Sequence, residues 1–165
     1  VDSGSSVGTT IARDIGQAVA SIQDVVRRFG RALVEKFIAG DEMTVGLLDG
    51  RALPPIVIRP RSEFYDYQAK YLAEDTEYLF DAGYPSELLE RACRLSERMF
   101  GRLDCRHLAR MDWMVDGDRQ LWFLECNTMP GFTSHSLLPK AAARVGIDFA
   151  ELCERLVRMA LRDRA

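Results

Sequence analysis

The chain has 165 residues, 47% of them hydrophobic and 28% charged, which is typical of a folded globular domain rather than a disordered segment. The 22 Lys and Arg residues are balanced by 25 Asp and Glu residues. The resulting net charge of −3 gives no reason to expect a nucleic acid or an anionic membrane as partner. No apolar run approaches the roughly 20 residues needed to cross a bilayer, so we expect no membrane span.

The cysteine and histidine content gives no sign of a metal centre. The 4 cysteines are widely spaced without a CxxC pair, and neither of the 2 histidines has metal-type spacing to them. We therefore expect reduced, buried thiols in a cytoplasmic protein. Because the chain begins at Val1 in an apparent loop and without Met, we also expect it to be part of a longer protein.

A small-residue loop and a helix come first in the chain. The loop at residues 3–8 has backbone N–H groups that could bind an anion, although such a segment alone is more often a plain linker. Asp14 is a good N-cap, apolar residues recur at helical spacing as far as Phe29, and Gly30 provides a stop. Residues 32–38 then form a short strand candidate.

A hairpin, a long loop and a second helix follow. Residues 43–48 and 52–58 flank Asp49-Gly50, a strong signal for a hairpin turn. Residues 59–84 lack sustained periodicity but are rich in tyrosine, and a long loop in a compact domain is usually functional or disordered. Pro85 is expected to open a helix that runs to about Phe100.

A second hairpin and two helices complete the predicted fold. Residues 108–115 and 120–125 are expected to pair around a turn that contains Asp116-Gly117-Asp118. A loop of small residues follows, and helices are predicted near 139–145 and 149–162. The alternation of helices with hairpins indicates an α+β fold with a mainly antiparallel sheet packed with helices.

Polar side chains gather on the second predicted hairpin. Glu125 and Asn127 are two positions apart in a strand and so share a face, and Asp112 lies at a possible cross-strand position. Two carboxylates and an amide oxygen suit Mg²⁺, although acidic strand ends are often merely solvated. Arg110 could bridge a phosphate, and the N–H groups at the Gly131 turn could stabilise an oxyanion.

Five segments resemble motifs of D-alanine–D-alanine ligases, in the order that the family has them. Residues 124–137 (LECNTMPGFTSHSL) resemble ExNTxPGxTxxSL, and residues 64–71 (FYDYQAKY) resemble the lid-loop motif YDYxxKY. Residues 35–42 (EKFIAGDE) resemble the nucleotide-binding EKxIxGxE. Residues 4–8 (GSSVG) resemble the phosphate loop, and residues 109–112 (ARMD) resemble the ARxD strand.

The resemblance implies an ATP-grasp-type C-terminal domain, truncated relative to the full ligase. Residues 1–38 would belong to the small lobe and residues 39–165 to the large lobe, with a mobile loop at 61–78. The N-terminal domain that binds the first D-alanine would lie outside this chain. The implied activity is ATP-dependent formation of D-alanyl-D-alanine, through an acyl phosphate, for peptidoglycan synthesis.

The resemblance also implies site roles. Asp112, Glu125 and Asn127 would bind Mg²⁺ (or Mn²⁺), and Arg110 with the Gly131 N–H would hold the reacting oxyanion. The other implied site residues match positions in the five motifs. They are Glu35, Lys36 and Ile38 for the nucleotide, Glu42 for the ribose, Lys70, Ser5 and Ser6 for the phosphates, Ser136 and Leu137 for the second D-alanine carboxylate, and Tyr71 for loop closure.

Some positions depart from the family pattern without removing an implied ligand. His107 stands where Gly is common, and Cys126 and Trp113 replace a small aliphatic residue and Phe. Strand alternation predicts that both Cys126 and Trp113 point away from the site and pack.

Two alternatives stay open at the level of the sequence. One is another ATP-grasp carboxylate–amine ligase, including one that uses D-lactate or D-serine as second substrate. The other is a catalytically silent ATP-grasp-like binding domain. We expect the isolated chain not to turn over, and the full-length enzyme to be a homodimer.

Overall fold

The computed structural model describes residues 8–60, 76–80 and 82–163. The chain divides into two compact units, one of Val1–Ile38 with Pro60–Thr76 and the other of Ala39–Arg59 with Glu77–Ala165. The assignment of residues 1–38 to a small lobe and 39–165 to a large lobe stays a prediction.

The first unit contains α1 (Ile15–Phe29), the helix that the sequence predicts. The Asp14 carboxylate accepts a hydrogen bond from the Gln17 N–H (2.8 Å) at its start. At its end Gly30 has a φ of 80° and donates its N–H to the Val26 carbonyl. No residue of α1 is fully buried, and Ile22 and Val25 on its apolar face are half-buried.

The strand predicted at residues 32–38 is wrong. This segment has no strand assignment, and Leu33, Val34 and Phe37 are all exposed. A strand is maintained by hydrogen bonds to a neighbouring strand, and within the described parts of the chain no segment pairs with this one. The apolar residues of this segment led to the prediction of a buried strand, but among the described residues no neighbouring strand pairs with it.

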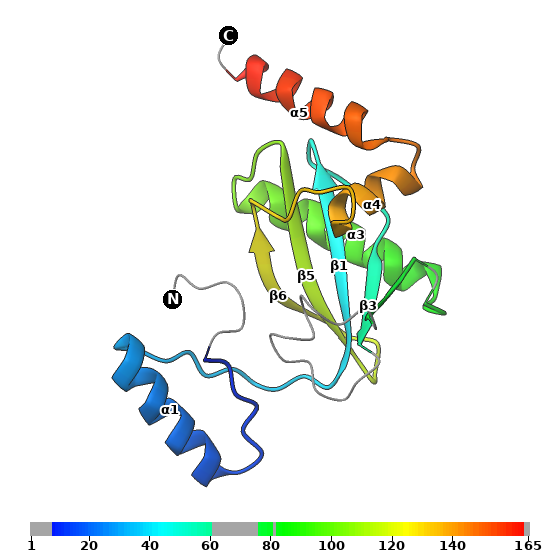
Figure 1. The fold of residues 1–165 in the computed structure, drawn as a ribbon. Coiled ribbons are helices and arrows are strands. Elements are labelled where there is room, and N and C mark those ends of the chain that lie inside the picture. The colour runs from blue at the N-terminus through cyan, green and yellow to red at the C-terminus, as the bar shows by residue number, and fades with distance from the viewer. Residues whose placement is uncertain (1–7, 61–75, 81, 164–165) are drawn as a thin grey trace. The chain divides into compact units, whose positions relative to one another are not determined.

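The second unit is built around a sheet (Figure 1), in which α3 crosses behind the strands. Its strands are β1 (Gly40–Leu48), β2 (Arg51–Ala52), β3 (Ile56–Pro60), β4 (Thr76–Leu79), β5 (Leu108–Asp116) and β6 (Leu121–Asn127). The strand order is β4-β3-β1-β5-β6, and β2 pairs with the end of β1. β1 runs antiparallel to β2, β3 and β5, and β5 runs antiparallel to β6, which confirms the predicted fold class.

The first hairpin turns at Asp49-Gly50, as predicted, with φ of 51° and 76°. Positive φ at both central residues is the signature of a type I′ turn. The returning strand is not continuous over 52–58, because Pro54-Pro55 interrupts it and proline cannot donate to a ladder. The last residues of the predicted loop 61–78 belong to β4, and its residues 61–75 lie outside the described part of the chain.

Three helices complete the second unit, close to their predicted bounds: α3 (Ser86–Arg102), α4 (Leu137–Arg144) and α5 (Phe149–Arg162). One hydrophobic core lies between α3 and one face of the sheet. It includes Met43, Val45 and Leu47 from β1, Met111, Trp113 and Val115 from β5, and Leu88, Ala92 and Phe100 from α3. A second core joins α4 and α5 to Leu48, Leu53 and Ile56.

Within the described residues, no helix is both long enough and apolar enough to span a membrane.

Candidate active site

The core between α3 and the sheet determines which side chains of β5 lie on the opposite face of the sheet. On β5, Met111 and Trp113 are buried in the core against α3, so Arg110 and Asp112 point to the other face. The register places Asp112 opposite Thr44 of β1 on one side and opposite Glu125 of β6 on the other. The cross-strand position predicted for Asp112 and Glu125 is therefore confirmed.

An irregularity in β6 makes this pairing compatible with the core. Trp113 pairs with Phe123, but the preceding residue Asp112 pairs with Glu125, so Leu124 is an extra residue in β6. Phe123 contacts the Trp113 ring edge-on, with 5.2 Å between ring centroids. The bulge thus lets Phe123 lie with the core-facing Trp113 while Glu125, only two residues later, lies beside Asp112.

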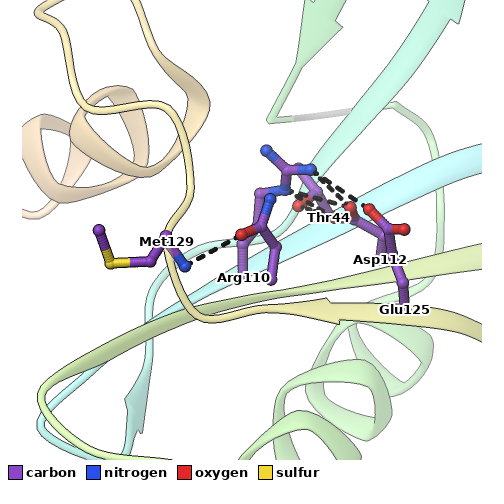
Figure 2. Close-up of polar contacts among 6 residues, drawn as sticks. Thr44, Arg110, Asp112, Glu125 and Met129 are labelled. Atoms are coloured by element: carbon purple, nitrogen blue, oxygen red, sulfur yellow. Dashed lines mark hydrogen bonds and ion pairs between the residues drawn. The ribbon is translucent and has the colours of Figure 1, made fainter. Parts of the chain in front are cut away.

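A network of short polar contacts surrounds Asp112 (Figure 2). Thr44 donates its hydroxyl to Asp112 Oδ1 at 2.7 Å. Arg110 donates Nε to both carboxylate oxygens, at 2.9 and 3.1 Å, and Nη2 to Oδ2 at 2.7 Å. The same Nη2 lies 3.9 Å from Glu125 Oε1. A single guanidinium therefore faces both carboxylates.

Burial makes these contacts energetically important. Asp112 is 3% exposed, and a buried carboxylate is stable only when it is paired and hydrogen-bonded. Burial by itself would lower the pKa of Arg110, but the hydrogen bonds to Asp112 and the nearby negative charges together raise the pKa above its ordinary value. The negative charges of Glu125 and Glu42 act in the same direction. The guanidinium is consequently a permanent positive charge at this position.

The residues present fit a hard divalent cation. Asp112, Glu125 and Asn127 offer only oxygen atoms, which is the ligand type that Mg²⁺ prefers. The carboxylates of Asp112 and Glu125 already face one positive charge, the guanidinium of Arg110. The Asn127 Oδ1 accepts the Met129 N–H at 3.0 Å, so this oxygen is engaged within its own loop. Among the described residues no cluster of three His, Cys, Asp or Glu side chains occurs.

The loop that follows β6 folds back onto the start of α4. Ser136 is the N-cap residue of α4, and its hydroxyl oxygen accepts the Thr133 N–H at 3.0 Å. Gly131 lies so close that a Cβ there would be 3.2 Å from the Ser136 oxygen. The first N–H groups of a helix have no partner within it, so Leu137 at the start of α4 belongs to a region suited to a carboxylate.

The implied nucleotide residues are divided between the units. Glu35 and Lys36 are exposed and Ile38 is half-buried, all in the first unit, whereas Glu42 lies on β1 in the second. Their roles stay predictions, as do those of Ser5, Ser6, Lys70 and Tyr71, which lie outside the described residues.

Thr44 is a site residue that sequence reasoning missed. It is 2% exposed, and the signal was available as a hydroxyl at an alternate position of the apolar run Met43–Leu48. A buried hydroxyl needs a hydrogen-bond partner, and a neighbouring strand that carries Asp112 could have supplied it.

The unusual residues around the site are explained by packing and backbone geometry. Trp113 is buried, as predicted, and donates its indole N–H to Ser96 at 3.0 Å. His107 has a φ of 64°, the left-handed region that Gly adopts most easily, which accounts for the frequent Gly of the resembling motif.

The four cysteines are free thiols, as predicted, but they are half-buried rather than buried. Cys126 packs towards the core, and its sulfur lies 3.7 Å from that of Cys105. Burial, together with the contact to Cys105, raises the pKa of Cys126 to about 12. The thiol therefore stays protonated near neutral pH.

Comparison with known proteins agrees with this geometry. A family model described as the D-ala D-ala ligase C-terminus matches residues 1–158. The D-alanine–D-alanine ligase of Syntrophotalea carbinolica is 45% identical over 154 residues, 93% of this chain and 50% of that protein. The corresponding ligase of Haemophilus influenzae is 39% identical over 158 residues, 96% of this chain and 53% of that protein.

A solved structure gives the same result. The D-alanine–D-alanine ligase of Bacillus anthracis, complexed with ATP, superposes with a TM-score of 0.78 at 33% identity, covering 92% of this chain and 48% of that one. The chain thus spans about half the length of the relatives it matches. By its sequence along nearly its whole length and by its fold, this chain belongs to the D-alanine–D-alanine ligase family, to the C-terminal part of these enzymes.

Proposed function

We propose that this chain supplies the catalytic C-terminal part of an ATP-dependent ligase that joins two D-alanine molecules for peptidoglycan synthesis. The observation that carries the proposal is the opposed pair of Asp112 and Glu125 with the Arg110 guanidinium facing both. A family member that had lost its chemistry would have no physical need to keep a buried carboxylate in so costly a place.

The site can serve charge-rich phosphate chemistry. Asp112, Glu125 and Asn127 would hold a magnesium or manganese ion, which when bound would neutralise negative charge on the transferring phosphoryl group. Arg110 would turn part of its fork from Asp112 to the reacting oxygen, because a planar guanidinium binds phosphate and oxyanions in pairs of hydrogen bonds. ATP as the nucleotide is supported by the ATP complex of the related Bacillus anthracis enzyme.

The loop and helix after β6 would position the second D-alanine. The Ser136 hydroxyl and the Leu137 N–H lie at the start of α4, where the helix dipole favours a carboxylate. The Gly131 N–H lies in the same loop and would stabilise the oxyanion of the tetrahedral intermediate. The substrate carboxylate would thus be anchored at the helix start, while the amine on the same Cα faces the acyl carbon.

The reaction would proceed in two displacements. The carboxylate of one D-alanine attacks the γ-phosphorus of ATP, and ADP leaves as an acyl phosphate forms. The amine of the second D-alanine then attacks the acyl carbon, loses a proton, and releases inorganic phosphate as the peptide bond forms. Lys70 and Arg110 would spread the developing charge, Ser5 and Ser6 would cover the phosphates, and Tyr71 in the loop 61–78 would help exclude water.

The complete enzyme would need more than this chain. The chain covers about half of its relatives, and the first D-alanine would be held by residues outside it. We therefore expect the 165-residue chain alone not to turn over, and the full-length cytoplasmic enzyme to act as a homodimer. Dipeptide synthesis by the isolated chain would contradict this part of the proposal.

The test uses a full-length protein that contains this chain, incubated with ATP, Mg²⁺ and D-alanine. We expect phosphate release coupled to formation of the D-alanyl-D-alanine dipeptide. The substitution Glu125→Gln should lower the rate at least about 10- to 100-fold. The matched control Glu90→Gln, on the exposed side of α3, should leave it unchanged.

Other outcomes separate the alternatives. Equal rates for the two Gln variants would remove Glu125 from the chemistry. Faster turnover with D-lactate or D-serine as second substrate would reassign the product. Absence of both turnover and a thermal shift with ATP and Mg²⁺ would identify a catalytically silent domain.

A further inference from the structure

A pair of thiols lies on the core side of the sheet, close to the candidate site but outside the proposed chemistry. Cys105 follows α3 in the segment that leads into β5, and Cys126 lies in β6. Their sulfur atoms are 3.7 Å apart, and both side chains are free and half-buried. The backbone N–H of Cys105 is fixed by a 3.0 Å hydrogen bond to the Phe100 carbonyl.

The separation is short enough for covalent closure. A disulfide bond is about 2.05 Å long, so each sulfur would need to move by less than about 1 Å. The two cysteines are contributed by a turn and a strand, and both can adjust by side-chain rotation. Two half-buried thiols can also meet simply as packing partners, so proximity alone does not decide whether they react.

Access for a small oxidant favours reaction over mere packing. In the strand order of the described residues β6 is an edge strand, with a neighbour only on its β5 side. Trp122, Phe123 and Leu124, just before the thiol-bearing end of β6, are all exposed. Cys105 and Cys126 are themselves half-buried rather than fully buried, so a small neutral molecule such as hydrogen peroxide can approach them in this chain.

We propose that Cys105 and Cys126 are a reversible redox pair that a peroxide converts into an intramolecular disulfide. The Cys105 sulfur gives up its proton and attacks a peroxide oxygen, which gives a sulfenic acid on Cys105 and releases one water molecule. The second sulfur displaces the sulfenic oxygen, which leaves with two protons as a second water molecule. Each sulfur loses one electron, and the two electrons reduce one hydrogen peroxide to two water molecules.

The proposed pair has a direct connection to the site. Cys126 lies between Glu125 and Asn127, so drawing its sulfur towards Cys105 would shift the strand end that carries both side chains. If the proposed function holds, the oxidised full-length enzyme loses activity and a thiol reductant restores it. That consequence rests on the proposed function, whereas disulfide formation itself does not.

The test compares two double variants of the 165-residue chain. Cys93→Ser with Cys153→Ser retains only the pair, and Cys105→Ser with Cys126→Ser retains only the two other thiols. Each is treated with stoichiometric hydrogen peroxide, then alkylated, weighed by intact mass spectrometry and digested with trypsin. Circular dichroism of each variant checks that it is folded.

We expect the chain that keeps the pair to lose both alkylatable thiols while staying monomeric, and to regain them with dithiothreitol. Its digest should contain a peptide that joins residues 105 and 126, and the other variant should form no internal disulfide. Two thiols that remain alkylatable, or a disulfide only between two chains, would overturn the proposal. Should the control variant fail to fold, the variant that keeps the pair decides the question alone. Because mass detects the bond, its absence is distinguishable from failure of the ligase function.

Discussion

The strongest test of the site's energetics is the substitution Arg110→Met. Methionine keeps an unbranched apolar stem of similar length but removes the guanidinium that pairs with Asp112. The Asp112 carboxylate, 3% exposed, would then have the Thr44 hydroxyl as its remaining side-chain donor among the described residues. Its negative charge would be buried without a counter-ion.

The expected loss follows from that burial. Removing one partner of a buried ion pair costs about 3–5 kcal/mol, because the remaining charge is uncompensated. The Arg110 side chain is 22% exposed, so water can partly hydrate the site, and we expect about 2–4 kcal/mol. With a slope of about 2 kcal/mol per molar urea, the unfolding midpoint should fall by about 1–2 M.

Urea unfolding followed by tryptophan fluorescence measures this loss, since both tryptophans lie in the second unit. The double variant with Asp112→Asn removes the charge as well, so it should be more stable than Arg110→Met alone. If the proposed cation site is correct, Mg²⁺ should stabilise Arg110→Met more than the unchanged chain. A loss below about 1 kcal/mol for Arg110→Met, with simple additivity in the double variant, would refute the reasoning.

Two further predictions concern residues of β1 that contribute to the folding stability of the second unit. Gly40→Ala should cost more than about 3 kcal/mol in the free energy of unfolding, because its Cβ would lie 1.9 Å from the Val115 carbonyl oxygen. Thermal denaturation measures this, and the matched Gly117→Ala, where nothing lies within 4 Å, should be nearly neutral. Burial would raise the pKa of Asp41, but hydrogen bonds, chiefly from Arg59, lower it below its ordinary 3.8. Its stabilising contribution is therefore complete well above pH 3.8 and is lost as pH falls through the lower folded value. Asp41→Asn should flatten the dependence of the urea midpoint on pH below about 5, and an unchanged slope would contradict this.

Local signals predicted the elements well where local physics determines them. The helix from Ile15 is set by the Asp14 cap and the Gly30 stop, and the first hairpin by the two positive φ values that Asp49-Gly50 adopts easily. These features need no distant residue. The segment at 32–38 is different, because a strand also requires a neighbour, and periodicity cannot show whether one is present.

The candidate site was predictable in part for the same reason. Alternation along β5 places Arg110 and Asp112 on one face, and alternation along β6 places Glu125 with Asn127. The pairing of Asp112 with Glu125 also depends on the bulge at Leu124, which no spacing rule predicts. The hydrogen bond from Thr44 to Asp112 depends on the register between β1 and β5, because the two residues are 68 positions apart in the sequence. The contact between Cys105 and Cys126 likewise depends on tertiary packing, and no local pattern encodes it.

The bulge at Leu124 shows how the core and the site constrain each other. In a regular strand Phe123 and Glu125 would share a face, so either the ring would leave the Trp113 side or the carboxylate would leave Asp112. The inserted residue removes the conflict, because it reverses the alternation between these two positions. The arginine then stabilises what the bulge brings together, since two carboxylates on adjacent strands repel unless a cation faces both. The same arrangement that stabilises the two neighbouring carboxylates is therefore suited to a divalent cation, and the ligase chemistry we propose would use that cation at this position.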